Sequence, residues 1–422
     1  MNILILGGGG REHALAWAVK QNPKCDRLIV APGNAGIGQV AECAALDILN
    51  PALVVRFCEE NAVDFVIVGP EGPLAAGVTD ALRAAGILCF GPSAAAARLE
   101  ASKAFTKEVC DAVGAPTAPW RRFDDLAAAR AHVAAMGLPL VIKADGLAAG
   151  KGVVIPETPA QAMAALEAVF ASYGSSVVIE EFMAGEEASF FVLVDGETCL
   201  PLGTAQDHKR VGEGDTGPNT GGMGAYSPAP VLTEAIQAQV MAEIVRPTMA
   251  EMARRGTPFQ GVLYAGLMIA GGRARLVEYN VRFGDPECQA LMMRLGAQAL
   301  DLMLACAQGR LDRARVSWAE DHALCVVMAA KGYPGPVETG TGIGGLDTLP
   351  ADSMQMMFHA ATRAEGGRTV AAGGRVLGAT GRGATLAEAR ARAYALVAAV
   401  DWPGGFCRAD IGWRALTGTT TG

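Results

Sequence analysis

Several features that would assign the chain to a special class are missing. No run of about 18 apolar residues occurs, which argues against a membrane-spanning helix. The ten cysteines include no Cys-x-x-Cys pair, so the pattern predicts neither a zinc site nor a thioredoxin-like motif. Most of them lie inside apolar runs, which is typical of small core residues in a reducing compartment. The apolar stretch behind Met1 is too short for a signal peptide, and we therefore expect a cytoplasmic protein.

An excess of positive charge is missing as well. The 35 Lys and Arg residues are outnumbered by 43 Asp and Glu, and the net charge of −8 argues against a protein held on nucleic acid through its phosphates. Lysine is scarce, with 8 of the 35 basic residues, yet Lys103, Lys143, Lys151 and Lys209 lie in the segments singled out below. With 51% hydrophobic and 18% charged residues, the 422-residue chain is expected to fold into about two to four domains and to be a monomer.

The order of apolar runs predicts an α/β protein of several domains. Across residues 1–101, short strands alternate with helical segments, which is typical of a parallel, Rossmann-like sheet. Residues 102–188 begin with a helix and contain further strands and helices, and residues 189–322 are rich in strands. Residues 323–422 form a small mixed domain, in which Thr385-x-x-Glu388 is a helix capping box and the glycine pairs at 344–345, 366–367 and 373–374 indicate hairpin turns.

A glycine-rich loop follows the first predicted strand. Gly7–Gly10 leads directly into a helix, whose free N–H groups can bind an anion. The dinucleotide fingerprint fails, because Glu12 or His13 stands at the third glycine position and the second strand ends without an acidic residue for a ribose. The loop favours the phosphate of a smaller ligand, with a plain tight turn as the alternative.

A second glycine-rich loop lies between two predicted strands, at Lys143-Ala-Asp-Gly-Leu-Ala-Ala-Gly-Lys151-Gly. It is not a Walker loop, because its glycine spacing is one residue short and no helix follows. Small residues and two lysines suit a flap that covers phosphates. A surface hairpin with glycine turns is the alternative.

The predicted strand 177–182 ends in Glu-Phe-Met and is followed by Glu186 and Glu187. Such a segment can offer backbone groups and an apolar wall to a purine, and the carboxylate beyond it can accept hydrogen bonds from ribose hydroxyls. A charged turn on a solvated hairpin is the alternative.

The segment Glu278-Tyr-Asn280-Val-Arg282 predicts a metal site. Side chains alternate along a strand, so Glu278 and Asn280 share one face. Carboxylate and amide oxygens suit Mg²⁺, which shares its ligands with phosphates. Arg282 can form a bidentate pair with a carboxylate or a phosphoryl group. A polar strand end satisfied by internal salt bridges is the alternative.

A long loop without signals of secondary structure runs from the charged cluster Gln206–Arg210 to Gly224. Long loops of this kind are usually functional or disordered, so a substrate site is expected here. His208 is interpreted as a structural hydrogen-bonding residue rather than a base.

These segments together resemble the ATP-grasp ligases, and within them the glycinamide ribonucleotide synthetase family of purine biosynthesis. The resemblance rests on the Lys143–Gly152 loop, Asn-Thr-Gly-Gly-Met-Gly-Ala-Tyr-Ser-Pro from Asn219, and Glu-Tyr-Asn-Val-Arg-Phe-Gly-Asp-Pro-Glu from Glu278. The opening Gly-Gly-Gly-Gly-Arg-Glu-His-Ala and the closing Phe-Cys-Arg-Ala-Asp-Ile-Gly also match, so the resemblance runs from residue 1 to about 416. It implies that 102–188 and 189–322 are the small and large ATP-grasp subdomains of a stand-alone ligase.

The resemblance also implies site residues. ATP would contact Lys103, Lys143, Gly150, Lys151, Gly152, Glu180, Glu181, Phe182, Met183 and Glu187. Mg²⁺, with Mn²⁺ as a substitute, would bind Glu278 and Asn280. The substrates would contact Gly8, Gly9, Gly10, Glu12, Asp207, Lys209, Asn219, Gly221, Gly222, Met223, Arg282 and Asp285. Within these sets Lys143, Arg282 and Asp207 would be catalytic.

The implied reaction joins glycine to 5-phosphoribosylamine at the expense of ATP. Glycyl phosphate is the intermediate, and glycinamide ribonucleotide, ADP and phosphate are the products. We expect neither nucleic acid nor a membrane as a partner. Three alternatives remain at this stage: another ATP-grasp carboxylate–amine ligase, a nicotinamide-dependent oxidoreductase built on the 1–100 sheet, and a nucleotide sensor without catalysis.

Overall fold

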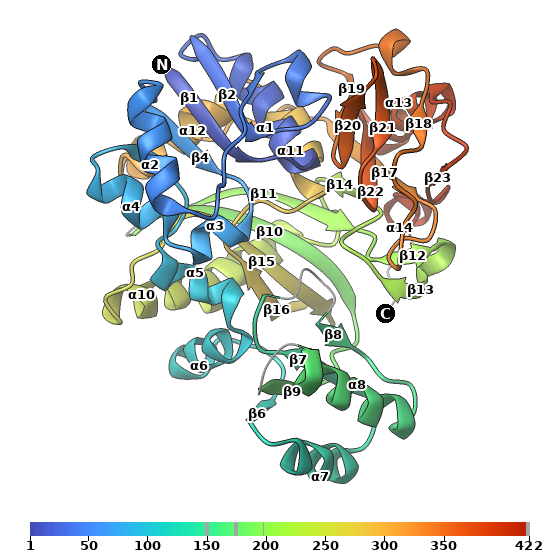
Figure 1. Cartoon of the computed structure of the whole chain (residues 1–422). Coiled ribbons are helices and arrows are strands. Elements are labelled where there is room, and N and C mark those ends of the chain that lie inside the picture. The colour runs from blue at the N-terminus through green and yellow to red at the C-terminus, as the bar shows by residue number, and fades with distance from the viewer. Residues whose placement is uncertain (148–151, 173–175, 197, 419–422) are drawn as a thin grey trace.

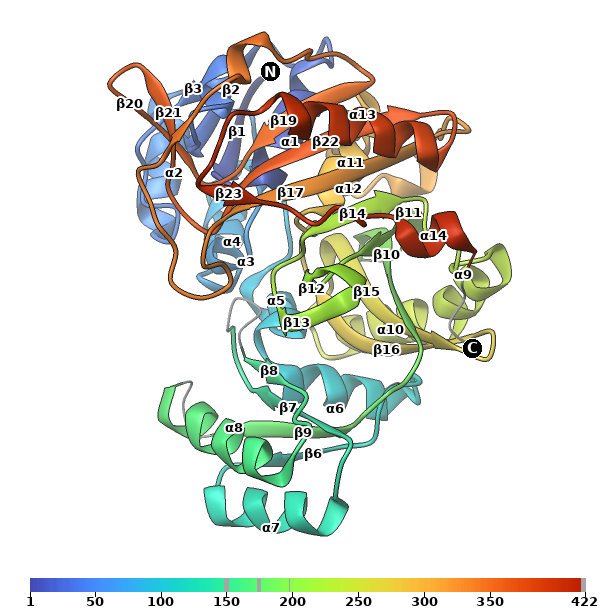
Figure 2. The same ribbon diagram turned by 90° about the vertical axis from the view of Figure 1, so that its right-hand side faces the viewer.

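The strands of the chain form five sheets in the computed structural model, which describes residues 1–147, 152–172, 176–196 and 198–418. The N-terminal sheet and the C-terminal strands lie side by side in the upper part of the molecule (Figure 1). A four-stranded sheet with helices α7 (Leu126–Met136) and α8 (Pro159–Ser172) projects below them in both views (Figure 2). Among the described residues no single helix is long and apolar enough to cross a membrane, and only the bent pair α11 (Glu287–Leu295) and α12 (Gln298–Ala307) meets that test by length and composition.

The N-terminal region forms the expected parallel sheet, in the order β3-β2-β1-β4-β5. Its central strands are buried on both faces, which explains their continuous apolar runs. Asn50 begins α2, because its side chain accepts a hydrogen bond from the Leu53 N–H at 3.2 Å. The elements are β1 (Asn2–Gly7), α1 (Gly10–Lys20), β2 (Arg27–Pro32), β3 (Glu42–Cys43), α2 (Pro51–Glu60), β4 (Phe65–Val68), α3 (Glu71–Ala75), α4 (Val78–Ala84), β5 (Leu88–Phe90) and α5 (Ala94–Ala101).

The four-stranded sheet is antiparallel, in the order β6-β9-β7-β8. Helices α7 and α8 contribute to one small core with these strands. The strands are β6 (Trp120–Phe123), β7 (Leu140–Ala144), β8 (Val153–Val154) and β9 (Val177–Glu181), and the helices are α6 (Lys103–Val113), α7 (Leu126–Met136) and α8 (Pro159–Ser172).

A nine-stranded antiparallel sheet joins the middle of the chain to its end, in the order β16-β15-β10-β11-β14-β17-β22-β19, with β23 beside β17. Pairing of β14 with β17 makes the sheet continuous between the strand-rich middle region and the C-terminal region. The strands are β10 (Glu186–Asp195), β11 (Cys199–Asp207), β14 (Gly224–Ser227), β15 (Gln260–Ala270), β16 (Arg273–Asn280), β17 (His322–Ala330), β19 (Gln355–His359), β22 (Arg375–Gly383) and β23 (Gly405–Phe406).

Helices and two small sheets complete the described chain. The helices are α9 (Glu234–Val240), α10 (Arg246–Arg254), α11 (Glu287–Leu295), α12 (Gln298–Ala307), α13 (Leu386–Ala399) and α14 (Trp413–Thr417). The small sheets contain β12 (Arg210–Gly212) and β13 (Thr216–Asn219), and β18 (Gly342–Ile343), β20 (Thr362–Glu365) and β21 (Arg368–Ala371).

The local signals of the C-terminal region are partly confirmed. Thr385 begins α13 by accepting a hydrogen bond from the Glu388 N–H at 3.2 Å. The Gly366–Gly367 pair makes the β20–β21 hairpin turn. The other two glycine pairs do not make hairpin turns: Gly345 precedes a short 3-10 helix, and Gly373–Gly374 connects strands of different sheets. Glycine supplies positive φ in many kinds of connection, so a pair alone does not specify a hairpin.

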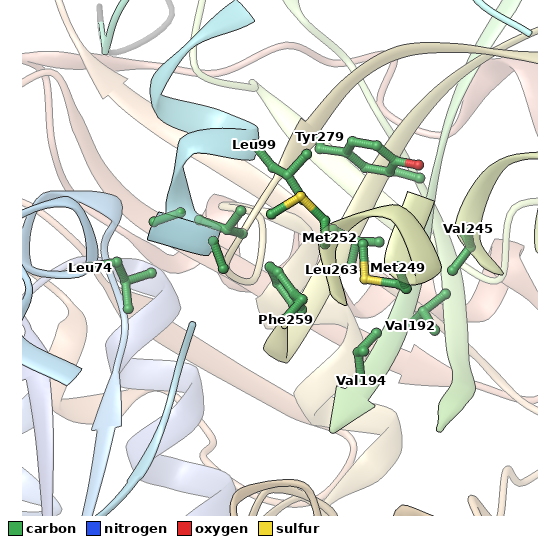
Figure 3. Close-up of a cluster of buried hydrophobic side chains, with 14 of the residues drawn as sticks. Leu74, Leu99, Val192, Val194, Val245, Met249, Met252, Phe259, Leu263 and Tyr279 are labelled. Atoms are coloured by element: carbon green, nitrogen blue, oxygen red, sulfur yellow. The ribbon is translucent and has the colours of Figure 1, made fainter. Parts of the chain in front are cut away.

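The N-terminal and central regions share one hydrophobic core (Figure 3). Leu74 and Leu99 come from the N-terminal helices, and Val192 and Leu263 come from the nine-stranded sheet. The two regions are therefore expected to unfold together.

Shortening a side chain in this shared core should destabilise the whole chain. Leu263 is completely buried, so Leu263→Ala should lower the free energy of unfolding by about 2–5 kcal/mol, measured by urea denaturation. Leu49→Ala is the matched control, because Leu49 is 55% exposed and its loss should cost less than about 0.5 kcal/mol. Equal losses in the two variants would contradict this account of the core.

Candidate functional site

One cleft of about 780 Å³ collects side chains from every region of the fold. Its walls come from the N-terminal helices, the four-stranded sheet, the nine-stranded sheet and the C-terminal segment. The charged residues that line it include Arg11, Glu71, Glu100, Lys103, Lys107, Lys143, Glu180, Glu187, Asp207, Lys209, Arg210, Asp215, Glu278, Arg282, Asp285, Glu287, Arg375 and Arg414. Such a concentration of charge suits ionic substrates.

Two buried lysines share one buried glutamate at the end formed by the four-stranded sheet. Lys143 on β7 lies 2.8 Å from Glu180 Oε1, and Lys107 on α6 lies 3.0 Å from Glu180 Oε2. The side chains are no more than 5% exposed. Burial lowers the pKa of Lys107, an effect that Glu180 partly offsets. Both carboxylate oxygens of Glu180, a predicted ATP contact, therefore lie beside lysine ammonium groups.

Lys107 was missed in the sequence, although a signal for it was present. It stands four residues after Lys103 in the predicted helix, so the two lysines share one helix face. Lys103 donates to the Gly146 carbonyl at 3.0 Å, and burial lowers its pKa.

The two strands that flank the predicted flap, β7 and β8, pair with each other in antiparallel fashion. The Ala144 N–H donates to the Gly152 carbonyl at 2.7 Å and closes its base. Gly146, Leu147 and Gly152 line the cleft. The predicted ATP contacts Gly150 and Lys151 lie outside the described residues.

An apolar wall adjoins the lysines, where β9 ends. Phe182 and Met183 line the cleft together with Val141 and Ile155. Met183 is buried, whereas Phe182 is 40% exposed. The geometry is suited to an aromatic ring with polar edges.

Glu278 and Asn280 lie on one face of β16, as the alternation predicts. They pair with Gly266 and Tyr264 on β15 in regular register. Burial alone would raise the pKa of Glu278, but the ammonium groups of Lys209, Lys143 and Lys103 hold it below the usual value. No residue in the described ranges donates a hydrogen bond to this carboxylate, which leaves its oxygens available as ligands.

The donor set fits Mg²⁺ only in part. Glu278 and Asn280 offer hard oxygen atoms, although Asn280 Oδ1 also accepts a hydrogen bond from Arg282 at 3.1 Å. Within the described ranges no group of three or more His, Cys, Asp or Glu side chains is placed to hold a metal ion. A cation at this pair therefore needs further oxygen ligands, such as those of phosphates.

Arg282 is held by two carboxylates of the N-terminal region that the sequence did not single out. It lies 2.8 Å from Glu100 and 3.3 Å from Glu71. Burial would lower its pKa, but the two carboxylates raise it above the usual value. No local pattern marks Glu71 and Glu100, because only the tertiary fold brings them to Arg282.

Asp207, Lys209 and Glu187 meet where β10 and β11 face the cleft. Lys209 forms an ion pair with Glu187, so these predicted substrate and ribose ligands contact one another. Burial raises the pKa of Asp207 to about 7; Lys209 opposes this rise, and the carboxylates of Glu287 and Glu187 add to it. Asp207 is therefore a carboxyl group that can take up or release a proton near neutral pH.

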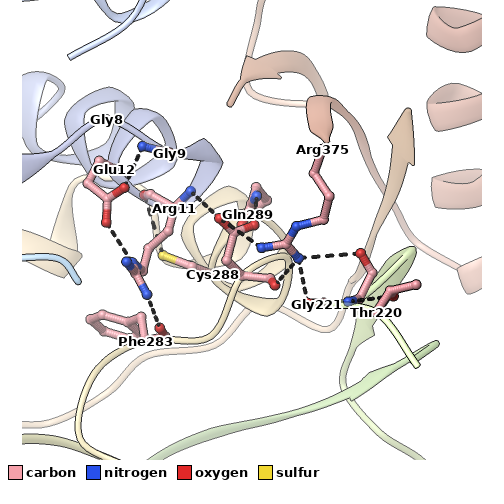
Figure 4. Close-up of polar contacts among 12 residues, drawn as sticks. Gly8, Gly9, Arg11, Glu12, Thr220, Gly221, Phe283, Cys288, Gln289 and Arg375 are labelled. Carbon is pink, nitrogen blue, oxygen red and sulfur yellow. Dashed lines mark hydrogen bonds and ion pairs between the residues drawn. The ribbon is translucent and has the colours of Figure 1, made fainter. Parts of the chain in front are cut away.

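The glycine loop lies between β1 and α1, and the Glu12 side chain folds back onto it (Figure 4). The Gly9 N–H donates to the Glu12 carboxylate at 2.6 Å, so this one N–H is bound by the chain's own carboxylate. A Cβ at Gly8 would lie 2.5 Å from the Gly33 carbonyl oxygen, and one at Gly10 would lie 2.5 Å from Gln289 Nε2. These two glycines thus serve close packing, and the neighbouring Arg11 lines the cleft instead.

Arg375 joins the C-terminal region to two predicted substrate segments. It donates to the carbonyl groups of Gly221 and Asp285 (Figure 4), and its guanidinium helps to hold the pKa of the Asp285 carboxyl below the usual value although burial would raise it. Asn219 and Gly221 line the cleft. The side chain of Met223 lies in the C-terminal core, away from the cleft, and the Gly222 N–H donates to Thr220.

His208 takes the structural role that its surroundings predicted. It is completely buried, its pKa is lowered by burial, and its Nε2 accepts a hydrogen bond from the Gly412 N–H at 2.9 Å.

Comparisons with known proteins place this cleft in a family. Models of the phosphoribosylglycinamide synthetase N domain, ATP-grasp (A) domain and C domain match residues 1–100, 101–288 and 323–414. A phosphoribosylamine–glycine ligase of Mesorhizobium japonicum is 57% identical over 420 residues, which is 99% of each chain. This chain belongs to the phosphoribosylglycinamide synthetase family. As a member it is an ATP-dependent ligase of purine biosynthesis.

Other relatives match over nearly the whole of this chain. A chloroplastic phosphoribosylamine–glycine ligase of Arabidopsis thaliana is 52% identical, covering 96% of this chain and 79% of its own. The crystal structure of a phosphoribosylamine–glycine ligase from Thermotoga maritima superposes with a TM-score of 0.85 at 31% identity, over 98% of this chain and all of that one. A biotin carboxylase of Campylobacter jejuni, at 17% identity and a TM-score of 0.73, over 96% of this chain and 92% of its own, shares the fold alone.

Removing the shared carboxylate should destabilise this phosphoribosylglycinamide synthetase family member before any substrate binds. Glu180→Gln leaves two buried ammonium groups without their counter-charge, so the free energy of unfolding at pH 7 should fall by about 3–5 kcal/mol. Chemical denaturation without nucleotide measures it. Glu181→Gln, at the exposed neighbouring position, should cost less than about 0.5 kcal/mol. If the two variants are equally stable, Glu180 does not hold the lysines.

Proposed function

We propose that this chain joins glycine to phosphoribosylamine with ATP, through glycyl phosphate, and releases glycinamide ribonucleotide, ADP and phosphate. One observation carries the proposal: a single cleft combines a lysine-rich end and an apolar wall with an oxygen-ligand pair and a mixed-charge end. These are the parts needed to hold a nucleoside triphosphate beside a carboxylate and an amine. Family membership supplies the identity of the acid and the amine.

The lysine-rich end binds the phosphates in this proposal. Lys143 lies 3.3 Å from the carbonyl of Val277, the residue before Glu278, and the ammonium groups of Lys103 and Lys143 both act on the pKa of Glu278. Ammonium groups gathered around a single carboxylate leave positive charge that a polyphosphate can neutralise. The adenine ring then lies against Phe182 and Met183, and Glu187 receives the ribose hydroxyls after exchanging its contact with Lys209.

Glu278 and Asn280 hold the divalent cation in this arrangement. Bound there, Mg²⁺ supplies charge neutralisation for the phosphates, and Mn²⁺ can replace it because both accept oxygen ligands. The low pKa of Glu278 keeps its carboxylate charged and ready to bind at neutral pH.

The mixed-charge end orients the two reacting groups. The carboxylate of glycine attacks the γ-phosphate of ATP in line, and the amine of phosphoribosylamine then attacks the acyl carbon of the glycyl phosphate as phosphate leaves. Arg282, Lys209 and the Asn219–Gly221 backbone orient glycine, and Arg11 and Asp285 lie on the phosphoribosylamine side. Asp207, with its pKa near 7, is suited to take the proton that the attacking amine loses. Positioning and charge neutralisation do most of the work.

The other readings of the sequence fit the cleft less well. A nicotinamide cofactor would need the glycine loop for its pyrophosphate, but the third glycine of the fingerprint is missing and the Gly9 N–H is bound to Glu12. A sensor without catalysis does not need a buried carboxylate poised near neutral pH.

Phosphate release tests the proposal directly. With ATP and Mg²⁺, phosphate should be released only when glycine and phosphoribosylamine, generated in situ, are both present, and mass spectrometry should detect glycinamide ribonucleotide. If phosphate is released only with a different acid and amine, the ATP-grasp chemistry stands but the assignment of glycine and phosphoribosylamine as substrates is wrong.

The metal assignment predicts a specific loss of activity. Glu278→Gln keeps the shape of the side chain and removes its charge, so turnover should fall by more than about 100-fold, because loss of an outer partner of a metal ligand already costs about 10–100-fold. Circular dichroism should show an intact fold. Glu365→Gln, on the exposed β20–β21 hairpin, is the control and should retain full activity. Wild-type turnover in Glu278→Gln would remove the metal assignment.

A further inference from the structure

The C-terminal motif Phe406–Gly412 has no part in the ligation steps above, yet it contains a large, almost completely buried charge. The Arg408 side chain is 1% exposed. The motif connects β23 to α14, and both views show α14 near the small sheet of β12 and β13 (Figure 1, Figure 2). Burying a guanidinium costs free energy unless the group is paired and hydrogen-bonded. The partners of Arg408 therefore indicate what the motif does.

Arg408 binds two aspartates and a backbone carbonyl. Its Nε and Nη2 donate to the two oxygens of Asp410 at 2.8 and 2.7 Å, a bidentate pair. Its Nη1 donates to Asp215 Oδ1 at 3.0 Å and to the Arg210 carbonyl at 2.9 Å. Asp215 and Arg210 both belong to the hairpin of β12 and β13, so one side chain connects the C-terminal segment to two points of that hairpin.

Neighbouring groups reinforce this connection. The Gly214 N–H donates to Asp410 Oδ2 at 2.8 Å, and the Ala409 N–H donates to Glu213 Oε1 at 3.1 Å. Arg414 donates to the second oxygen of Asp215. The turn of the hairpin is therefore held from the C-terminal segment by both backbone and side-chain contacts.

The motif itself is fixed to helix α13. Tyr394 donates to the Arg408 carbonyl at 2.7 Å, and Arg390 donates to the Ile411 carbonyl at 3.0 Å. These contacts to a packed helix hold the motif rigidly, as is needed if the motif is to fix the position of the β12–β13 hairpin.

The braced hairpin forms part of the cleft. Arg210, Gly214, Asp215 and Asn219 line it, and the hairpin leads directly into the Thr220–Gly221 segment. Asp215 has φ +59°, a left-handed conformation that a residue with a side chain adopts at a cost and keeps only when its surroundings enforce it. The two arginines bound to its carboxylate enforce it here.

We propose that Arg408 is a positioning residue, which fixes the β12–β13 hairpin on the substrate side of the cleft through Asp215. Arg408 touches no substrate; it acts through the hairpin that carries Asn219. The inference rests on the proposed function, because glycine and phosphoribosylamine are assigned to this side of the cleft. Among the described residues, those of β7 and β9 on the nucleotide side form no hydrogen bond or ion pair with the motif.

Kinetics of Arg408→Met and Arg408→Lys separate positioning from general stability. In Arg408→Met, kcat/KM for glycine should fall by about tenfold or more, since misplacement by about 1 Å can cost about 100-fold, and KM for ATP should change by less than about threefold. Arg408→Lys should recover part of the loss, because its ammonium can still reach one aspartate. Asp410→Asn keeps the side-chain volume and serves as a second variant should Arg408→Met fold poorly.

A buried arginine elsewhere provides the matched control. Arg294 is also buried and paired with an aspartate, Asp321, but it has no contact with the hairpin. Arg294→Met should lower the melting temperature without the selective loss of kcat/KM for glycine. Equal effects on glycine and ATP in Arg408→Met, or the same kinetic pattern in Arg294→Met, would overturn the proposal.

Hydrogen exchange distinguishes failure of this inference from failure of the proposed function. Amides of residues 209–220 should exchange faster in Arg408→Met than in wild type, while those of β7 and β9 keep their rates. This readout needs no turnover, so it stands even if the wild-type chain forms no glycinamide ribonucleotide. If the amide exchange rates of residues 209–220 are unchanged in Arg408→Met, Arg408 does not fix the hairpin and the proposal is wrong.

Discussion

The balance of buried lysine charge is the constraint on which the cleft depends. Of the eight lysines in a chain that otherwise uses arginine, Lys103, Lys107, Lys143 and Lys209 line the cleft. Ammonium groups away from water are stable only beside anions, and Glu180, Glu187 and Glu278 supply part of that charge. A compact ammonium also serves as a point charge that an incoming phosphate can approach from several directions, unlike a planar guanidinium.

The same constraint explains why the regions of the chain are joined so closely. Glu71 and Glu100 of the N-terminal region hold Arg282, which also donates to Asn280, and Arg375 of the C-terminal region holds Asp285 and Gly221. The nine-stranded sheet runs without interruption through the β14–β17 pair. The walls of the cleft are therefore held in place by contacts between different regions of the chain, which converge on it.

The sequence predicted the fold class and much of the cleft, because the informative signals were local. Alternation placed Glu278 and Asn280 on one face of β16, and Asn50 and Thr385 marked the starts of helices that the structure contains. Contacts between segments far apart in the chain could not be predicted from the sequence. Nothing in the spacing of the glycine loop shows that the Glu12 side chain folds back to Gly9.

Other misses share that cause. The motif around Met223 gave no sign that this side chain belongs to the C-terminal core, and Glu100 became relevant only when α5 packed beside Arg282. Lys107 is different, since its spacing from Lys103 was a usable local signal.

Titration calorimetry of adenine nucleotides tests the charge account most directly. If the lysines are gathered for phosphates, Lys103→Met should weaken binding of MgATP by about tenfold or more, or about 1.4 kcal/mol, and leave the binding of adenosine unchanged. An equal loss of affinity for both ligands, or no loss for MgATP, would contradict the claim that the buried ammonium groups are held in place for a polyphosphate.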